Sequence, residues 1–133
     1  MIGIVIVAHG GLAAEYLAAM EHVVGHKPGT RAISISRDDD RDAKKAEIRA
    51  AANEVDDGDG VVVVTDLFGG TPSNLAINAC ENGARKVIYG ASLPLLVKLA
   101  KSRHLPLDES TRCACEAGRK YMNSMEPYTK SDD

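Results

Sequence analysis

Short runs of valine and isoleucine alternate along this chain with longer segments in which apolar residues recur at helical spacing. Turn-forming residues border the short runs, which is typical of buried strands. The strand candidates are residues 2–8, 31–36, 60–65 and 85–91. The longer segments predict helices over residues 12–24, 40–57, 72–83, 93–103 and 108–124. We expect the first helix to bury the face that holds Leu12, Tyr16, Ala19, Met20 and Val23.

The order of these elements predicts the fold class. Strand followed by helix, repeated four times, favours a doubly wound α/β fold with a mainly parallel four-stranded sheet and helices on both faces. The first and third runs are apolar at almost every position, so we expect them to be the central strands and neighbours in the sheet. With 133 residues the chain is long enough for one core, and we expect one domain.

Charge and apolar content exclude two kinds of partner. The net charge is −3 and the 16 basic residues are scattered, so the sequence shows no basic footprint for nucleic acid. No apolar run reaches the ~20 residues that a membrane span needs, and we expect no leader segment. Three cysteines without paired zinc spacing favour reduced thiols. The sequence therefore predicts a cytoplasmic protein with no nucleic-acid binding and no membrane insertion.

Two polar residues directly follow the two most apolar strands. His9 comes after the first run and Asp66 after the third. Ligands of parallel α/β sheets collect outside the carboxyl ends of the strands, so we expect these residues to meet there. A histidine can carry a phosphoryl group when one ring nitrogen attacks and the other keeps its proton in a hydrogen bond. Asp66 would accept that bond and orient the ring, so His9 and Asp66 form the candidate catalytic pair.

Glycine turns flank both residues and could supply hydrogen-bond donors to a phosphoryl group. Glycine permits positive φ and lets the backbone approach a ligand closely, and a helix start leaves backbone N–H groups free. Thr71 precedes Pro72 as an N-cap residue would, so its hydroxyl is expected either to cap the helix or to bond a phosphate oxygen. The candidate phosphate-binding residues are Gly10, Gly11, Gly70, Thr71 and Ser73.

The residues around this pair do not predict a metal or a cofactor. Magnesium would need several carboxylates, but Asp66 is needed by the imidazole and the acidic run at residues 38–40 starts the second helix. His22 and His26 are expected at a solvated helix end. Lys44, Lys45 and Arg49 are expected to form a solvated face, with docking of an acidic partner as the alternative. Metal-free transfer between proteins fits this pattern best.

The motifs at these positions resemble a known family. GIVIVAHG at residues 3–10 and DLFGGTPSN at residues 66–74 are similar to the enzyme IIA component of the mannose class in the bacterial phosphoenolpyruvate-dependent sugar phosphotransferase system (PTS). The resemblance covers residues 1–125 and includes GASLPLL at residues 90–96 and EAGR at residues 116–119. We therefore expect a PTS IIA domain over residues 1–125, followed by a C-terminal tail of residues 126–133.

The resemblance implies an activity and partners. His9 would take a phosphoryl group from the phosphocarrier protein HPr and pass it to a IIB component, or hold it as a regulatory signal. Such a carrier is a phosphotransferase component that needs no cofactor. The resemblance also implies a homodimer in which a fifth, antiparallel strand is exchanged between subunits.

Two departures from the family pattern bear on the role. Some members carry a hydroxyl residue directly after the aspartate, where this chain has Leu67. Transport members are often fused to a IIB domain, and the chain shows none after its last helix. A stand-alone IIA serves a separate IIB or acts as a regulatory sensor, and the layout favours the second.

Three other classes of protein share part of this pattern. A receiver-like domain needs an acidic pair after the first strand, where this chain has Ala8, His9 and Gly10. A nucleotide-binding module needs a G-x-G-x-x-G turn or a P-loop, and a hydrolase needs a serine or cysteine at a nucleophile elbow; the sequence has none of these. The alternative that stays open is a regulatory module that binds an anion or a nucleotide without phosphotransfer.

Overall fold

The computed structural model describes residues 1–67, 70–80 and 83–127. Its strands are β1 (Gly3–His9), β2 (Thr30–Ile35), β3 (Val61–Thr65) and β4 (Arg85–Tyr89). Its helices are α1 (Leu12–Val24), α2 (Arg41–Val55), α3 (Thr71–Ala79), α4 (Leu93–Lys101) and α5 (Leu107–Lys120). Every strand and helix expected from the sequence is present, and their ends move by a few residues.

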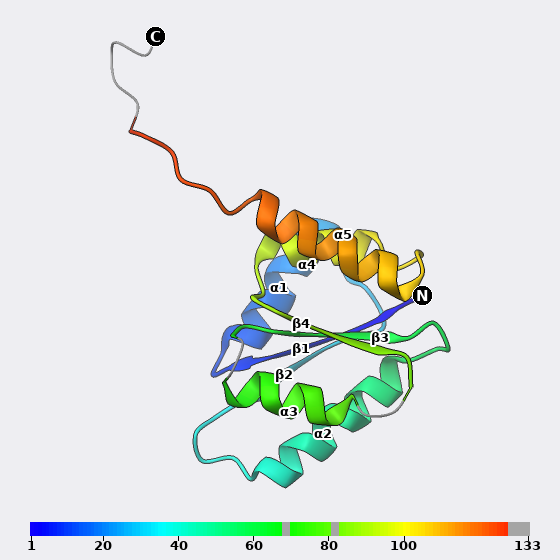
Figure 1. Cartoon of the computed structure of the whole chain (residues 1–133). Helices are drawn as coiled ribbons and strands as arrows, with labels where there is room; N and C mark the ends of the chain where they lie inside the picture. The colour runs from blue at the N-terminus through cyan, green and yellow to red at the C-terminus, as the bar shows by residue number, and fades with distance from the viewer. Residues whose placement is uncertain (68–69, 81–82, 128–133) are drawn as a thin grey trace.

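The strands form one parallel sheet in the order β2-β1-β3-β4. Helices α1, α4 and α5 cover one face, and α2 and α3 cover the other (Figure 1). This arrangement confirms the doubly wound α/β fold and the central position of the first and third strands. Among residues 1–67, 70–80 and 83–127 the sheet has no fifth, antiparallel strand.

Alternating side chains of the central strands fill two separate cores. Ile4 and Ile6 of β1 face α1, α4 and α5, while Val5 and Val7 face α2 and α3, and all four are fully buried. Strands buried on both faces must be apolar at successive positions, which is why β1 and β3 read as continuous hydrophobic runs. The two cores hold the strands rigidly, so the residues at their carboxyl ends are set in fixed positions.

Helix α1 buries a different face from the one expected. Ala13 and Met20 are fully buried and Tyr16 packs beside them, but Leu12 is 45% exposed and Val23 is 52% exposed. The expectation for Leu12 and Val23 was therefore wrong. Apolar residues surround much of this helix, so several rotations about its axis satisfy helical periodicity, and packing against α4 and the sheet decides among them.

Helices α2 to α5 all end earlier than the sequence indicates, and the ends of α3 and α5 differ most. Helix α3 ends at Ala79, and Cys80 caps it with an N–H bond to the carbonyl of Ile77 at 3.1 Å. Residues 81–82, which fell within the helix expected at 72–83, lie outside the described residues. Helix α5 ends at Lys120, and residues 121–127 extend away from the body (Figure 1).

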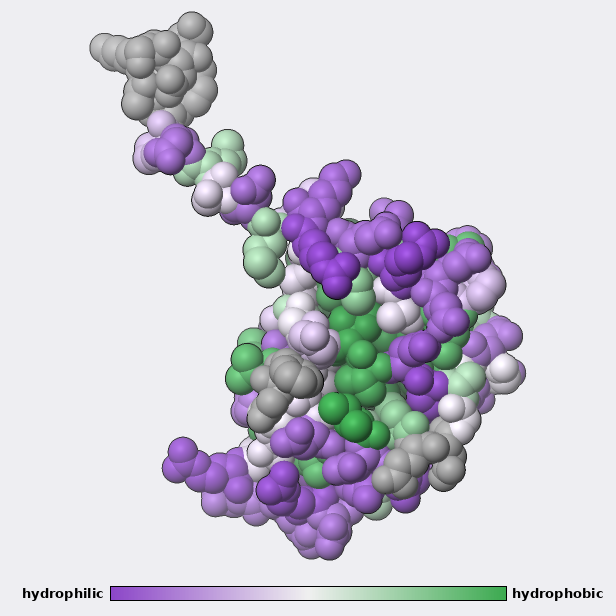
Figure 2. Space-filling view, viewed as in Figure 1, coloured by the Kyte–Doolittle hydropathy of each residue, from purple (hydrophilic) through white to green (hydrophobic). Residues whose placement is uncertain are grey.

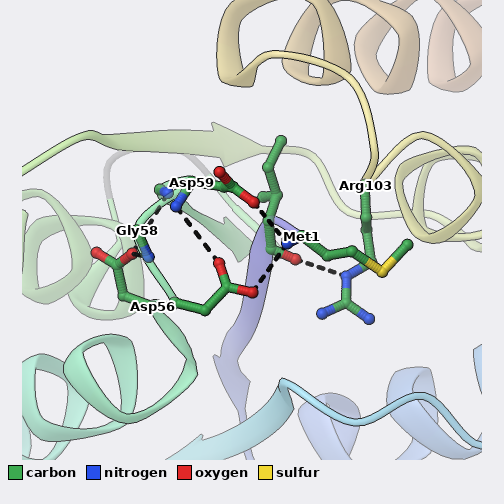
Figure 3. Close-up of polar contacts among 8 residues, drawn as sticks. Met1, Asp56, Gly58, Asp59 and Arg103 are labelled. Atoms are coloured by element: carbon green, nitrogen blue, oxygen red, sulfur yellow. Dashed lines mark hydrogen bonds and ion pairs between the residues drawn. The ribbon is translucent and has the colours of Figure 1, made fainter.

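The amino ends of the strands are held by a buried arginine. Arg103, which follows α4 and is 5% exposed, donates from Nε to the carbonyl of Ile2 at 2.5 Å, and the N–H of Ile2 donates back to the carbonyl of Arg103 at 3.0 Å. Burial lowers the pKa of this guanidinium, and Asp57 acts in the opposite direction. Figure 3 shows Arg103 beside Met1, whose amino group bonds Asp57 and Asp59. This cluster lies at the end of the sheet opposite to His9.

Replacing this arginine should affect stability and leave phosphotransfer intact. We expect Arg103→Met to lower the free energy of unfolding by about 2 kcal/mol, because a buried hydrogen bond to a charged group is lost. Urea denaturation measures the change. Arg112→Met is the control, since Arg112 pairs with Glu116 on the exposed surface of α5 and its loss should cost less than about 0.5 kcal/mol. Equal costs in both variants would contradict the anchoring role of Arg103.

Candidate functional site

His9 and Asp66 lie at the carboxyl ends of two adjacent strands, at the point where the strand order of the sheet reverses. His9 is the last residue of β1, and Asp66 follows the last residue of β3. The chain passes from β1 to β2 on one side and later returns to place β3 on the other side of β1. Adjacent crossovers thus leave in opposite directions, and a crevice forms between the ends of β1 and β3. The fold brings the two residues to the usual ligand position of an open α/β sheet.

One carboxylate oxygen of Asp66 fixes the histidine in place. Oδ2 lies 2.9 Å from the ring Nδ1 of His9 and also accepts from the backbone N–H of His9 at 3.1 Å. The His9 side chain is 48% exposed, whereas that of Asp66 is 10% exposed. With Nδ1 held as the donor to Asp66, the accessible nitrogen Nε2 carries the free lone pair. The contact with Asp66 thus fixes the orientation of the ring and leaves Nε2 as the nitrogen available to a ligand.

The carboxylate of Asp66 stays ionised in this environment. Burial raises its pKa, but the hydrogen bonds from the ring and the backbone of His9 outweigh burial, and the net pKa is below the ordinary value. Its other oxygen, Oδ1, is buried and has no hydrogen-bond partner among the described residues. An anionic Asp66 favours positive charge on the imidazole, which develops when Nε2 attacks an electrophile.

The turn after β1 is tied to the neighbouring strand. Gly10 adopts φ +54°, which favours glycine, and its N–H donates to the carbonyl of Ile35 at 3.0 Å. Its carbonyl accepts from the hydroxyl of Ser34 at 2.6 Å. Gly11 then caps α1 with a negative φ of −82°. Helix α1 begins at Leu12, so its first backbone N–H groups lie within a few residues of His9 along the chain.

The start of α3 approaches the imidazole from the other side. Gly70 caps α3 with φ −87°, so Thr71 is the first helical residue and the expectation that it occupies the N-cap is wrong. A Cβ on Gly70 would lie 3.4 Å from Cε1 and 3.7 Å from Nε2 of His9, which is ordinary van der Waals contact, so the start of α3 packs directly beside the ring. Ser73 is 1% exposed and its hydroxyl donates to the carbonyl of Gly70. Ser73 therefore stabilises this turn with its side chain.

A cleft of about 400 Å³ opens beside His9 and Thr71. Its other charged residues come from the loop after β2 and the first turn of α2: Arg37, Asp39, Arg41 and Lys44. The sequence assigned Lys44 to a solvated face and did not single out Arg37 or Arg41. The strand order could have indicated Arg37 and Arg41, because the loop after β2 starts at the same end of the sheet as His9. Within the described ranges, no group of three or more metal-ligating side chains is placed to hold a metal ion.

Comparison with known proteins identifies the family. The model of a family described as PTS system fructose IIA component, EIIA-man, matches residues 3–112. This chain belongs to the PTS EIIA-man family. The resemblance to the mannose-class IIA component is thereby confirmed. Of the motif residues, Phe68 and Gly69 lie outside the described residues, and Leu67 is 58% exposed with a hydrocarbon side chain that offers no hydrogen bond.

Related proteins match most of the chain. It is 32% identical over 104 residues to the putative phosphotransferase enzyme IIA component YadI of Escherichia coli, covering 77% of this chain and 71% of that protein. It is 27% identical over 127 residues to the mannose-specific EIIAB component of the same organism, covering 93% of this chain and 39% of that protein. The chain thus spans about two fifths of the EIIAB protein.

Solved structures share the fold. An EIIA component from Streptococcus agalactiae matches with a TM-score of 0.83 at 25% identity, covering 93% of this chain and 97% of that one. A mannose/sorbose-specific IIA subunit from Enterococcus faecalis matches with a TM-score of 0.85 at 24% identity, covering 96% and 97% of the two chains. The IIA fold extends over nearly the whole chain.

Gly70→Ala should slow phosphorylation without unfolding the protein. The negative φ of Gly70 suits alanine, and the added methyl group would contact Cε1 and Nε2 of His9 and occupy part of the space through which a phosphoryl group reaches Nε2. We expect a change in stability of less than about 1 kcal/mol and a roughly tenfold slower reaction. Thermal unfolding and initial rates of phosphorylation measure the two effects.

Gly11→Ala is the matched comparison for this variant. Gly11 is also an N-cap glycine with negative φ, and a Cβ there meets nothing within 4 Å. We expect its effect on the phosphorylation rate to be clearly smaller. Equal slowing in both variants would assign the effect to the helix starts instead of to crowding of Nε2.

Proposed function

We propose that this chain is a phosphohistidine carrier of the phosphotransferase system, with His9 as the residue that is phosphorylated. The observation that carries the proposal is the contact between Nδ1 of His9 and Asp66, which leaves Nε2 free on a half-exposed ring beside a cleft lined by the starts of α2 and α3. Family membership supplies the phosphotransferase chemistry in general, and this geometry supports Nε2 of His9 as the atom that reacts.

The transfer needs one bond to form and one to break. Nε2 of His9 attacks the phosphorus of phosphorylated HPr, the bond between phosphorus and the donor nitrogen breaks, and the electron pair of that bond returns to the HPr imidazole. Nδ1 of His9 keeps its proton, and Asp66 stabilises the positive charge that the ring acquires. In this proposal the backbone N–H groups of Gly11, Gly70 and Thr71 bind the phosphoryl oxygens, whereas the N–H of Gly10 is already bonded to the carbonyl of Ile35.

The onward step has two outcomes in this proposal. The phosphoryl group passes to a IIB component, or the phosphorylated protein acts as a regulatory signal on another target. The related EIIAB protein combines two components in its name, whereas this chain matches about two fifths of its length. We place the reaction in the cytoplasm, and none of the described helices has the length and apolar character of a membrane span.

The direct test is the intact mass of the protein after incubation with phosphoenolpyruvate, enzyme I and HPr. We expect one added phosphoryl group that is lost in acid and stable in base, as a phosphohistidine is. Addition of a IIB protein should then discharge it. An unmodified protein would reject the carrier function and favour the alternative, a module that binds an anion or nucleotide, which a rise in melting temperature on adding the ligand would detect.

We also propose that the protein is a homodimer. Within the described residues, β4 pairs with β3 and has no neighbour on its outer edge, and apolar surface lies between the two helical layers at this edge (Figure 2). Met122 and Met125 of the extending segment are 81% and 92% exposed. An exchanged antiparallel strand would cover both features. Sedimentation should give twice the chain mass, and a monomer at micromolar concentration would contradict this proposal.

A further inference from the structure

The cleft beside His9 has two cations without a partner among the residues that the structure describes. Arg37 and Arg41 line this cleft, and neither makes a hydrogen bond or an ion pair with any described residue. Lys44 also lines it but is engaged, with its Nζ 2.9 Å from Glu47 and 3.9 Å from Asp39. The two guanidinium groups are therefore available to a ligand in the cleft.

The loop that carries these arginines is held in a defined shape. Asp39 accepts from the backbone N–H of Ser36 at 2.7 Å, and its own N–H donates to the carbonyl of Ser36 at 3.2 Å. Asp40 caps α2 by accepting from the N–H of Asp42 at 3.0 Å. The turn at Gly10 is bonded to Ile35, two residues before Arg37. The loop and the histidine turn thus form one connected framework.

The acidic residues of this loop do not cancel the two cations within the cleft. Among the described residues that line it, Asp39 is the one carboxylate, and it is bonded to Ser36 and faces Lys44. Asp38, Asp40 and Asp42 are not among the residues that line the cleft, and Asp40 caps α2. An anion that enters the cleft therefore meets a net positive wall, although the whole protein has a net charge of −3.

We propose that Arg37 and Arg41 bind the phosphoryl group that His9 carries. The inference rests on the proposed carrier function and adds two residues that bind the transferred group. Guanidinium forks bind phosphate oxygens with paired hydrogen bonds, and the helix starts reach the group through backbone N–H groups. The arginines stabilise the phosphorylated form, so the phosphoryl equilibrium shifts from HPr toward this protein. A carrier that retains its phosphoryl group suits a regulatory signal.

The first experiment measures that equilibrium. Wild-type protein, Arg37→Gln, Arg41→Gln and the double variant are mixed with phosphorylated HPr, and the phosphorylated fractions are measured at equilibrium. We expect each single change to shift the equilibrium toward HPr by about tenfold and the double change by about a hundredfold. Lys45→Gln removes a nearby positive charge that does not line the cleft and should shift it by less than about twofold.

The second experiment phosphorylates the protein without HPr. Phosphoramidate phosphorylates histidine directly: its phosphorus–nitrogen bond breaks, the bond from phosphorus to Nε2 forms, and ammonia leaves. The pKa of the phosphoryl group is then followed by phosphorus NMR. Adjacent cations favour the doubly charged group, so we expect its pKa to rise by about one unit in the double variant and to stay unchanged in Lys45→Gln.

The two experiments separate the possible failures. An unchanged equilibrium or an unchanged phosphoryl pKa would overturn the proposal. A slower approach to an unchanged equilibrium would assign the arginines to docking of HPr, because docking changes the rate and not the equilibrium between the free proteins. If HPr fails to phosphorylate the wild type, the carrier function with HPr is rejected. The chemically phosphorylated protein still decides in that case whether the arginines bind the phosphoryl group.

Discussion

Phosphorylation should be abolished in the His9→Ala variant while the fold is retained. His9 supplies the nucleophile, so its removal is expected to lower the rate by at least about 10⁴-fold, below detection by intact mass. The side chain is 48% exposed and bonds to Asp66 at the surface, so no core contact is lost. Intact mass after incubation with phosphoenolpyruvate, enzyme I and HPr measures the first effect, and thermal unfolding measures the second.

His26→Ala is a matched control for this experiment. Its Nδ1 lies 2.6 Å from Glu21 Oε2, so it repeats the contact between histidine and carboxylate, but its side chain is 85% exposed near the end of α1. It lies beyond the carboxyl end of α1 and does not line the cleft beside His9, so we expect wild-type phosphorylation. A phosphoryl group on the His9→Ala protein would move the site to another residue, and loss of its fold would make His9 a structural residue.

The fold could be predicted because few arrangements of strands and helices bury the apolar residues of the central strands. Runs such as residues 61–64, apolar at successive positions, require burial on both faces, and the intervening helices supply it. The rotation of α1 could not be predicted, because Leu12 and Val23 fit helical periodicity as well as Ala13 does. Packing against other elements selects the buried face, and that information is absent from local sequence.

The candidate site could be predicted in part for a similar reason. His9 and Asp66 follow the two strands that the pattern makes neighbours, so their contact follows from topology. Arg37 and Arg41 belong to a charged segment that has the pattern of a solvated helix start. Their place in the cleft depends on the path of the loop after β2, which no periodicity encodes. The role of each residue in phosphotransfer stays a prediction until it is tested.

Asp66→Ala should slow phosphorylation by about 10³-fold without eliminating it, because Asp66 orients and stabilises the ring and does not react. In this variant Nδ1 loses its acceptor, so the ring is free to rotate and either nitrogen can hold the proton. The positive charge formed during attack also loses its partner. Initial rates measured with saturating phosphorylated HPr quantify the loss, and thermal unfolding checks the fold.

Asp66→Asn separates orientation from charge. The backbone N–H of His9 and its ring Nδ1 both point at Oδ2, so an amide oxygen in that place accepts both bonds, whereas an amide nitrogen would face the backbone donor. The asparagine should therefore keep its oxygen toward His9 and preserve the reactive tautomer. We expect a loss of about tenfold, which reflects charge alone. A loss as large as that of Asp66→Ala would show that the negative charge, and not the orientation of the ring, is the main contribution of Asp66.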